Sequence, residues 1–191
     1  MADERDAELW LVRHGETEWS RDGRHTSTTE LDLTETGVEV AQTLRDRLAD
    51  TSFDLVLTSP RHRARRTAEL AGFADAEVDD DLVEWDYGKV EGRTTADIRV
   101  GLPGWTVWDG PVPGGETLDE VAARADRVIA RLRAGSGDQA VIAHGHVLRV
   151  LAARWCGWRP VDGRHLPLAA GAVCELGWER ETPALVAWNR G

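Results

Sequence analysis

Short apolar runs alternate with longer stretches of helical spacing along this chain, and this alternation restricts its fold more than any other feature. The runs that predict strands are residues 8–12, 55–57, 140–143, 173–178 and 185–188. The stretches that predict helices are residues 36–49, 61–71, 117–132 and 147–155. Strands that alternate with helices are typical of α/β proteins. We therefore expect a three-layer sandwich, in which a mostly parallel central sheet is flanked by helices.

The length of the chain fits one domain. A chain of 191 residues can bury a sizeable hydrophobic core. The Gly/Pro-rich stretch 101–115 predicts a loop, but it is too short to separate two domains. We therefore expect a single domain that spans residues 1–191.

The charge and the cysteine content narrow the classes of partner and the compartment. The formal net charge is -11, which disfavours binding to nucleic acid or to an anionic membrane surface. No stretch approaches the roughly 20 apolar residues of a membrane-spanning helix. Cys156 and Cys174 form no CxxC pair, and the acidic N-terminus lacks the features of a signal peptide. These features predict a cytoplasmic protein.

Three of the predicted strands end in basic or histidine residues. The first runs into Arg13, His14 and Gly15, the second into Ser59 and a basic helix, and the third into residues 144–146, His-Gly-His. In open α/β sheets, ligands bind outside the carboxyl ends of the strands. Positive charge gathered there, in an acidic protein, predicts a small anionic ligand, and arginine suits phosphate especially well.

Two histidines beside arginines allow more than anion binding. The neighbouring cations lower the pKa of a histidine, and a neutral ring nitrogen can attack phosphorus to form a phosphohistidine. An alkoxide leaving group then needs a proton, for which Glu84 is the candidate donor and Asp86 the competing one. A zinc site built on His14, His144 and His146 is the alternative, but the nearby arginines would repel a cation.

Four motifs, in order, resemble those of the histidine phosphatase superfamily, also called the phosphoglycerate-mutase-like family. They are LVRHGETEWS at 11–20, residues 58–68 with Thr-Ser-Pro and Arg63-Ala64, residues 82–92 with Glu84 and Glu-Gly, and His144-Gly145. The agreement in order and spacing extends from about residue 9 to residue 149. The closest resemblance is to the branch of broad acid phosphatases and sugar-bisphosphatases, including sedoheptulose-bisphosphatase-like enzymes.

The resemblance implies a role for each matching position. His14 would be the phosphorylated nucleophile. Arg13 and Arg63 would bind the phosphoryl oxygens, and His144 would form the rest of the phosphate pocket and stabilise the transition state. Glu84 would protonate the leaving oxygen and then activate water. The residues expected to contact substrate are Arg13, Ser20, Thr26, Ser27, Arg63, Tyr87, His144 and Gly145. The family needs neither metal nor cofactor.

The chain departs from the family pattern at two positions. Ser20 stands where many members have asparagine, and Ser27 stands where many have glycine. We expect Ser20 to donate to phosphate with a shorter reach. We expect the Ser27 side chain either to narrow the mouth of the site or to remove a backbone approach to the substrate. These departures leave open a phosphate-ester-binding protein without turnover.

For some other residues the sequence allows two positions, and for the remaining histidines it predicts no role in the site. His146 either faces the pocket or solvates a helix start, and Trp105 and Trp108 either form a lid or pack on the body. The remaining histidines, expected at the surface or in loops, are His25, His62 and His165.

A mutase would need additional segments to close its pocket, and only the stretch 98–116 is available here. We therefore expect a phosphatase rather than a mutase. Its substrate would be a small phosphorylated metabolite, such as a phosphosugar, and we expect a homodimer.

Overall fold

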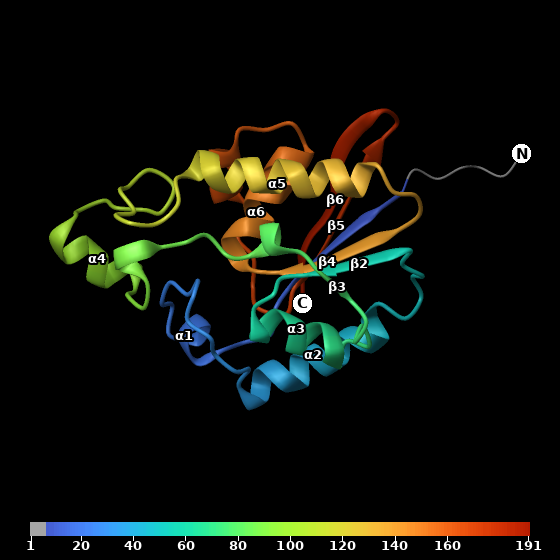
Figure 1. Ribbon diagram of the computed structural model, residues 1–191, viewed down its shortest axis with the longest axis horizontal. Helices are drawn as coiled ribbons and strands as arrows, with labels where there is room; N and C mark the ends of the chain where they lie inside the picture. Colours follow the sequence, from blue (N-terminus) through green and yellow to red (C-terminus); the bar gives the residue numbers. More distant parts are fainter. Residues whose placement is uncertain (1–6) are drawn as a thin grey trace, which may run out of the picture.

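One six-stranded sheet organises the computed structural model, which describes residues 7–191 (Figure 1). The strands lie in the order β3-β2-β4-β1-β5-β6. Their bounds are β1 Leu9–Arg13, β2 Leu55–Thr58, β3 Glu77–Val78, β4 Gln139–Ala143, β5 Val173–Glu179 and β6 Thr182–Arg190. The first four in this spatial order run parallel, and β5 and β6 add antiparallel pairs at one edge. The predicted α/β class and mostly parallel sheet are confirmed.

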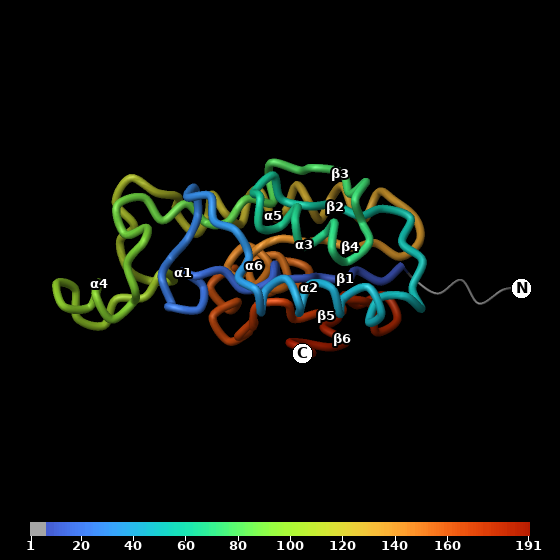
Figure 2. The backbone as a smooth tube through the Cα atoms, turned by 90° about the horizontal axis from the view of Figure 1, so that it is seen from below, coloured from blue at the N-terminus to red at the C-terminus, as the bar shows by residue number. Residues whose placement is uncertain are grey.

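Helices cover both faces of the sheet, as the three-layer prediction requires. The helices are α1 Glu18–Arg21, α2 Glu35–Arg47, α3 His62–Leu70, α4 Thr95–Gly101, α5 Leu118–Arg133 and α6 Gly145–Trp155. Short 3-10 helices lie at Asp80–Leu82, Gly88–Val90 and Pro160–His165. In Figures 1 and 2, α4 extends from one end of the molecule, away from the sheet.

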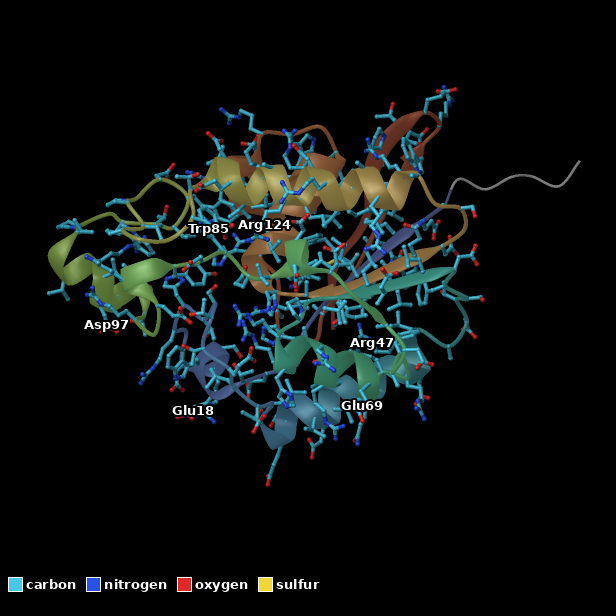
Figure 3. The ribbon with its side chains drawn as sticks, in the orientation of Figure 1. Glu18, Arg47, Glu69, Trp85, Asp97 and Arg124 are labelled. Carbon is cyan, nitrogen blue, oxygen red and sulfur yellow. The ribbon has the colours of Figure 1, made fainter. Side chains whose placement is uncertain are left out.

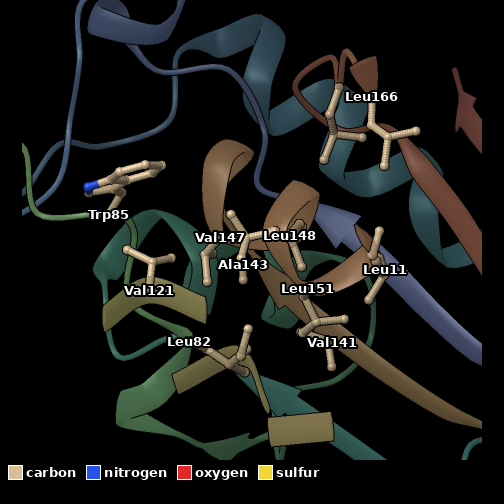
Figure 4. Packing of buried hydrophobic residues seen from close by; sticks show 14 of the residues in the cluster. Leu11, Leu82, Trp85, Val121, Val141, Ala143, Val147, Leu148, Leu151 and Leu166 are labelled. Carbon is tan, nitrogen blue, oxygen red and sulfur yellow. The ribbon is translucent and has the colours of Figure 1, made fainter. Parts of the chain in front are cut away.

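Alternation along the strands divides the core into two clusters. In β1, Leu9 and Leu11 join the cluster beneath α5 and α6, whereas Val12 joins the cluster beneath α2 and α3. Successive side chains of a strand point to opposite faces, so a strand covered on both sides must be apolar throughout. Figure 4 shows the first cluster, where Leu11 and Val141 of the sheet lie beside residues of α6. This packing fixes the strand ends that carry the polar residues.

The structure bears on two of the sequence predictions, those on membrane-spanning segments and on the N-terminus. No helix within residues 7–191 has both the length and the apolar character needed to cross a membrane. Residues 1–6, which carry most of the acidic N-terminus considered above, lie outside the described residues.

Candidate active site

The carboxyl ends of β1, β4 and β2 lie side by side, because β4 pairs with both of the others. Arg13 ends β1, His14 follows it, and His144 follows β4. The rings of His14 and His144 meet edge to face, with their centroids 5.1 Å apart. The topology therefore places the two histidines in contact, although 129 positions separate them in the chain.

His14 is buried and held in one tautomer. Its Nδ1 lies 2.7 Å from the carbonyl oxygen of Gly15, which can only accept, so Nδ1 carries the proton. Burial, and then the charges of Arg13 and Arg63, hold the pKa of His14 well below its usual value. The ring is therefore neutral, and its Nε2 has a free lone pair that can act as a nucleophile.

Arg63 is fully buried beneath the site, on the first turn of α3. Its Nη atoms donate to backbone carbonyls of the loop that precedes α2, those of Thr26, Ser27 and Thr29. These bonds fix the guanidinium but leave Nε without a partner. Arg13 is held in the same way, because its Nη1 donates to the carbonyl of Leu168 while its Nε stays unpaired.

His144 contributes a third unpaired atom. Its Nε2 lies 2.7 Å from the hydroxyl of Ser59, and its Nδ1 is buried without a partner. Burial and the charge of Arg63 keep the pKa of His144 well below its usual value. Among residues 7–191, only two further side-chain atoms, on Trp10 and Arg61, are buried and unpaired in this way. Buried polar atoms normally have partners, so three such atoms beside His14 point to a ligand with several acceptors.

Glu84 lies at the N-terminus of α6. One carboxylate oxygen accepts hydrogen bonds from the backbone N–H groups of Trp85 and Val147, and the other accepts from that of His146. The helix begins at Gly145, two residues before the predicted start, and its first turn supplies two of the three donors, the N–H groups of His146 and Val147. A Cβ at Gly145 would lie 3.4 Å from Nε of Arg13 and 3.7 Å from Glu84, so glycine keeps the space between them open.

An ion pair between buried Arg124 and half-buried Glu116 supports the segment that carries Glu84. Arg124 of α5 pairs with Glu116, and its Nη1 donates to the carbonyls of Asp81 and Val83. Glu116 in turn accepts from the backbone of Asp86. The position of Glu84 therefore depends on α5, which the sequence motifs do not include. Arg124 and Trp85 are labelled in Figure 3.

Replacing Arg124 with methionine should lower the free energy of unfolding by about 3 kcal/mol, because it leaves the half-buried Glu116 carboxylate and several backbone carbonyls without a donor. Urea denaturation measures this loss. The control is Arg127→Met, one helical turn further on, which removes an exposed pair with Asp81 and should change stability little. A loss for Arg124→Met as small as the one expected for Arg127→Met would show that the Arg124 network does not stabilise the fold.

A cavity of about 180 Å³ opens in front of His14. The predicted residues that line it are Arg13, His14, Ser20, Thr26, Glu84, Tyr87 and Gly145. Arg63, His144 and Ser27 are not in its wall but buried. The wall also includes residues that the motifs did not single out, namely Gly23, Arg24, His25, His146, Arg149 and Leu168. For Arg149 the signal was present, since it follows Gly145 and His146 at helical spacing.

Of the two residues that depart from the family pattern, Ser20 lies in the cavity wall and Ser27 does not. Ser27 does not narrow the mouth, because it is buried and its hydroxyl donates to the carbonyl of Glu84 at 3.3 Å. Ser20 lines the cavity, but its hydroxyl bonds to the backbone of Thr17 in a capping box. Both hydroxyls therefore serve the local structure.

His25 lies in a loop and His62 and His165 are exposed, as expected, but the His25 side chain is half-buried and lines the cavity. The backbone of His25 pairs with Gly92 and Arg93, which turns its side chain inward against Tyr87. Burial lowers its pKa to about 4, so the ring is neutral.

The remaining alternatives are resolved by packing. His146 faces the cavity, and its Nδ1 lies 2.6 Å from the hydroxyl of Tyr87, whose pKa burial raises well above its usual value. Trp105 is buried and Trp108 packs against the core, so both belong to the body of the protein. In the described part of the chain, no three His, Cys, Asp or Glu side chains are grouped to hold a metal ion.

Comparison with known proteins identifies the family. The model of the histidine phosphatase superfamily (branch 1) matches residues 9–191. An acid phosphatase of Mycobacterium tuberculosis is 39% identical over 179 residues, which cover 92% of this chain and 88% of the relative. Sedoheptulose 1,7-bisphosphatase of Saccharomyces cerevisiae is 36% identical over 77% of this chain and 66% of its own.

A solved structure of a Mycobacterium tuberculosis open reading frame product shows the same similarity in three dimensions. It aligns with a TM-score of 0.93 at 38% identity, over 97% of this chain and 98% of that chain. The family model and both relatives agree with the four motifs found in the sequence. The chain therefore belongs to branch 1 of the histidine phosphatase superfamily.

Proposed function

We propose that this protein hydrolyses small phosphomonoesters in two steps through a phosphohistidine on His14. Its family membership makes it a phosphoric monoester hydrolase. The observation that carries the proposed mechanism is the set of three buried, unpaired atoms beside His14: Nε of Arg13, Nε of Arg63 and Nδ1 of His144. A phosphoryl group has the oxygens to satisfy them, and they stabilise its charge during transfer.

In the first step, Nε2 of His14 attacks phosphorus while the bond from phosphorus to the leaving oxygen breaks. Glu84, which faces the same cavity, gives its proton to that oxygen. The positive charge that develops on the imidazole is shared with the carbonyl of Gly15 through Nδ1–H.

In the second step, the Glu84 carboxylate takes a proton from water, and the water oxygen attacks phosphorus. The phosphorus–nitrogen bond breaks, inorganic phosphate leaves, and neutral His14 is restored. Protons and charges therefore balance over the cycle, and Glu84 ends it protonated.

The substrate we propose is a small phosphorylated metabolite, such as a phosphosugar. A cavity of about 180 Å³ is smaller than the pockets that hold drug-sized molecules. The similarity to a sedoheptulose bisphosphatase favours a sugar phosphate. We also propose a cytoplasmic location and a homodimer, which cell fractionation and light scattering of the purified protein would test.

The experiment that tests this proposal measures inorganic phosphate release in excess chelator. The panel contains p-nitrophenyl phosphate, phosphoglycerates, sugar mono- and bisphosphates, and nucleotides. We expect release without added metal. Loss of activity on chelation with recovery on adding zinc would refute a metal-independent mechanism. Interconversion of 2- and 3-phosphoglycerate with little phosphate release would show a mutase, and tight binding without turnover would show a binding protein.

A further inference from the structure

Glu91 belongs to the third of the sequence motifs, but the proposed mechanism gives it no role. It follows the 3-10 helix Gly88–Val90 and is absent from the cavity wall in front of His14. Its side chain binds the loop 26–29 instead. This is the loop whose carbonyls accept hydrogen bonds from Arg63. The loop therefore lies between the Glu91 carboxylate and the Arg63 guanidinium.

The Glu91 carboxylate accepts three hydrogen bonds from this loop. Oε1 accepts from the backbone N–H groups of Ser27 at 3.1 Å and Thr29 at 2.8 Å, and Oε2 accepts from the hydroxyl of Thr28 at 2.7 Å. Burial raises the pKa of Glu91, but the hydrogen bonds from the loop outweigh burial and leave this pKa below its usual value. The carboxylate is therefore ionised at neutral pH, and its hydrogen bonds are of the strong, charge-assisted kind.

Arg63 binds the same loop through its carbonyl oxygens. Nη1 donates to the carbonyl of Thr29 at 3.1 Å, and Nη2 donates to those of Thr26 and Ser27 at 3.4 Å and 3.1 Å. The peptide group that joins Thr26 to Ser27 thus gives its N–H to Glu91 and its carbonyl to Arg63. Hydrogen bonds linked in such a chain polarise and strengthen one another. The two charged side chains therefore hold the loop from opposite sides.

The loop in turn fixes the orientation of the unpaired atom of Arg63. Among the described residues, the side chain of Arg63 donates only to this loop, and its buried Nε has no partner. Because the guanidinium is planar and rigid, the carbonyls that hold its Nη atoms also set the direction of Nε. Glu91 keeps these carbonyls in place, since it binds the N–H groups and the hydroxyl of the same four residues.

We propose that Glu91 is a positioning residue, which holds Arg63 through the loop 26–29 in the geometry that binds the phosphoryl group. Glu91 itself contacts neither the substrate nor His14. The inference rests on the proposed function for the nature of the ligand, and it adds a residue outside the cavity on which the phosphate pocket depends.

Binding of orthovanadate, which resembles a phosphoryl group during transfer, tests this role without turnover. Titration calorimetry compares wild type with Glu91→Ala, and melting temperatures establish that the variant is folded. We expect the substitution to weaken vanadate binding about tenfold, because without charge-assisted hydrogen bonds to Glu91 the loop no longer holds Arg63 in one orientation. The value of kcat/KM for p-nitrophenyl phosphate should fall by a similar factor.

Two conservative variants separate this role from a general effect on stability. The amide oxygen of Glu91→Gln can still accept from Ser27 and Thr29, so this variant should keep vanadate affinity within about threefold of wild type. Glu91→Asp keeps the charge but is shorter by one methylene group. It should lose affinity as the alanine variant does, and it serves if the alanine variant does not fold.

A double-mutant cycle on kcat/KM shows whether the effect passes through Arg63. Arg63→Lys keeps a buried cation but lacks the planar fork that the loop carbonyls orient. In this background, Glu91→Ala should lower kcat/KM by less than about twofold, since coupled positions are not additive.

Asp97→Ala is the matched control. The Asp97 carboxylate, labelled in Figure 3, also accepts from a backbone N–H and a threonine hydroxyl, both of Thr94, but at the start of α4 and outside the cavity wall. This variant should keep the vanadate affinity of wild type.

Several results would overturn the inference. Folded Glu91→Ala could bind vanadate as tightly as wild type, Glu91→Gln could lose as much affinity as Glu91→Ala, or Glu91→Ala could lower kcat/KM equally in the wild-type and Arg63→Lys backgrounds. In each case phosphate release by wild type would leave the proposed function standing. If wild type bound vanadate, lost this binding in Glu91→Ala and released no phosphate from any ester, the proposed function would fail and the positioning role would stand.

Discussion

Replacing His14 with alanine is expected to reduce phosphate release by roughly 10⁴-fold or more, since loss of a nucleophile has effects of this size in other enzymes. The substitution removes Nε2 of His14, whose free lone pair lies beside both arginines. Without Nε2 there is no phosphohistidine, and water would have to attack the ester directly. Initial rates with p-nitrophenyl phosphate measure the loss.

The control for this substitution is His62→Ala. His62 is exposed at the start of α3 and its side chain pairs with Asp32, outside the cavity wall, so its replacement should leave the rate nearly unchanged. Because His14 is buried, melting temperatures establish that the variant is folded, and His14→Asn provides a second, polar replacement. A folded His14 variant that kept more than a tenth of the wild-type rate would contradict the phosphohistidine mechanism.

A direct readout accompanies the rates. Rapid quenching of wild type with substrate into base should trap phosphate covalently on the protein, because a phosphorus–nitrogen bond resists base better than acid. His14→Ala should trap none.

The sequence was sufficient to predict the fold and the neighbourhood of His14 because both depend on local patterns. Apolar runs such as Leu9–Val12 predict strands, and the parallel arrangement brings their carboxyl ends together. The position of the residue that follows each strand can therefore be predicted from the strand arrangement alone, without knowledge of side-chain packing. The two-residue strand β3 and the short α4 were not predicted, since so few residues carry no periodicity.

The surroundings of the site could not be predicted because they depend on contacts between distant segments. His25 faces the cavity only because its backbone pairs with residues 92 and 93. Ser27 is buried because the backbone of its loop binds the Glu91 carboxylate and Arg63. Arg124 supports the Glu84 segment from a helix about 40 residues later. None of these contacts produces a periodic pattern of residues in the sequence, so none could be predicted from it.

Replacing Glu84 with glutamine is expected to lower kcat for alkyl phosphates by about 10²- to 10³-fold, the usual contribution of a general acid. The amide cannot give a proton to the leaving oxygen or take one from water. With p-nitrophenyl phosphate the first step should be affected less, because p-nitrophenolate leaves without protonation. The second step is still impaired, so we expect a burst of about one equivalent of p-nitrophenol, followed by slow turnover.

The burst separates the two roles of Glu84 from a simple loss of structure. Glutamine can keep the two hydrogen bonds that one carboxylate oxygen accepts, from Trp85 and Val147, but its amide group faces the N–H of His146. A general distortion would lower the rates for both kinds of ester and give no burst. Asp86→Asn is the control, because Asp86 binds the backbone of Gly88 and is absent from the cavity wall. If Asp86→Asn lost more activity than Glu84→Gln, the proton donor would be Asp86, and the helix N-terminus that holds Glu84 would serve structure alone.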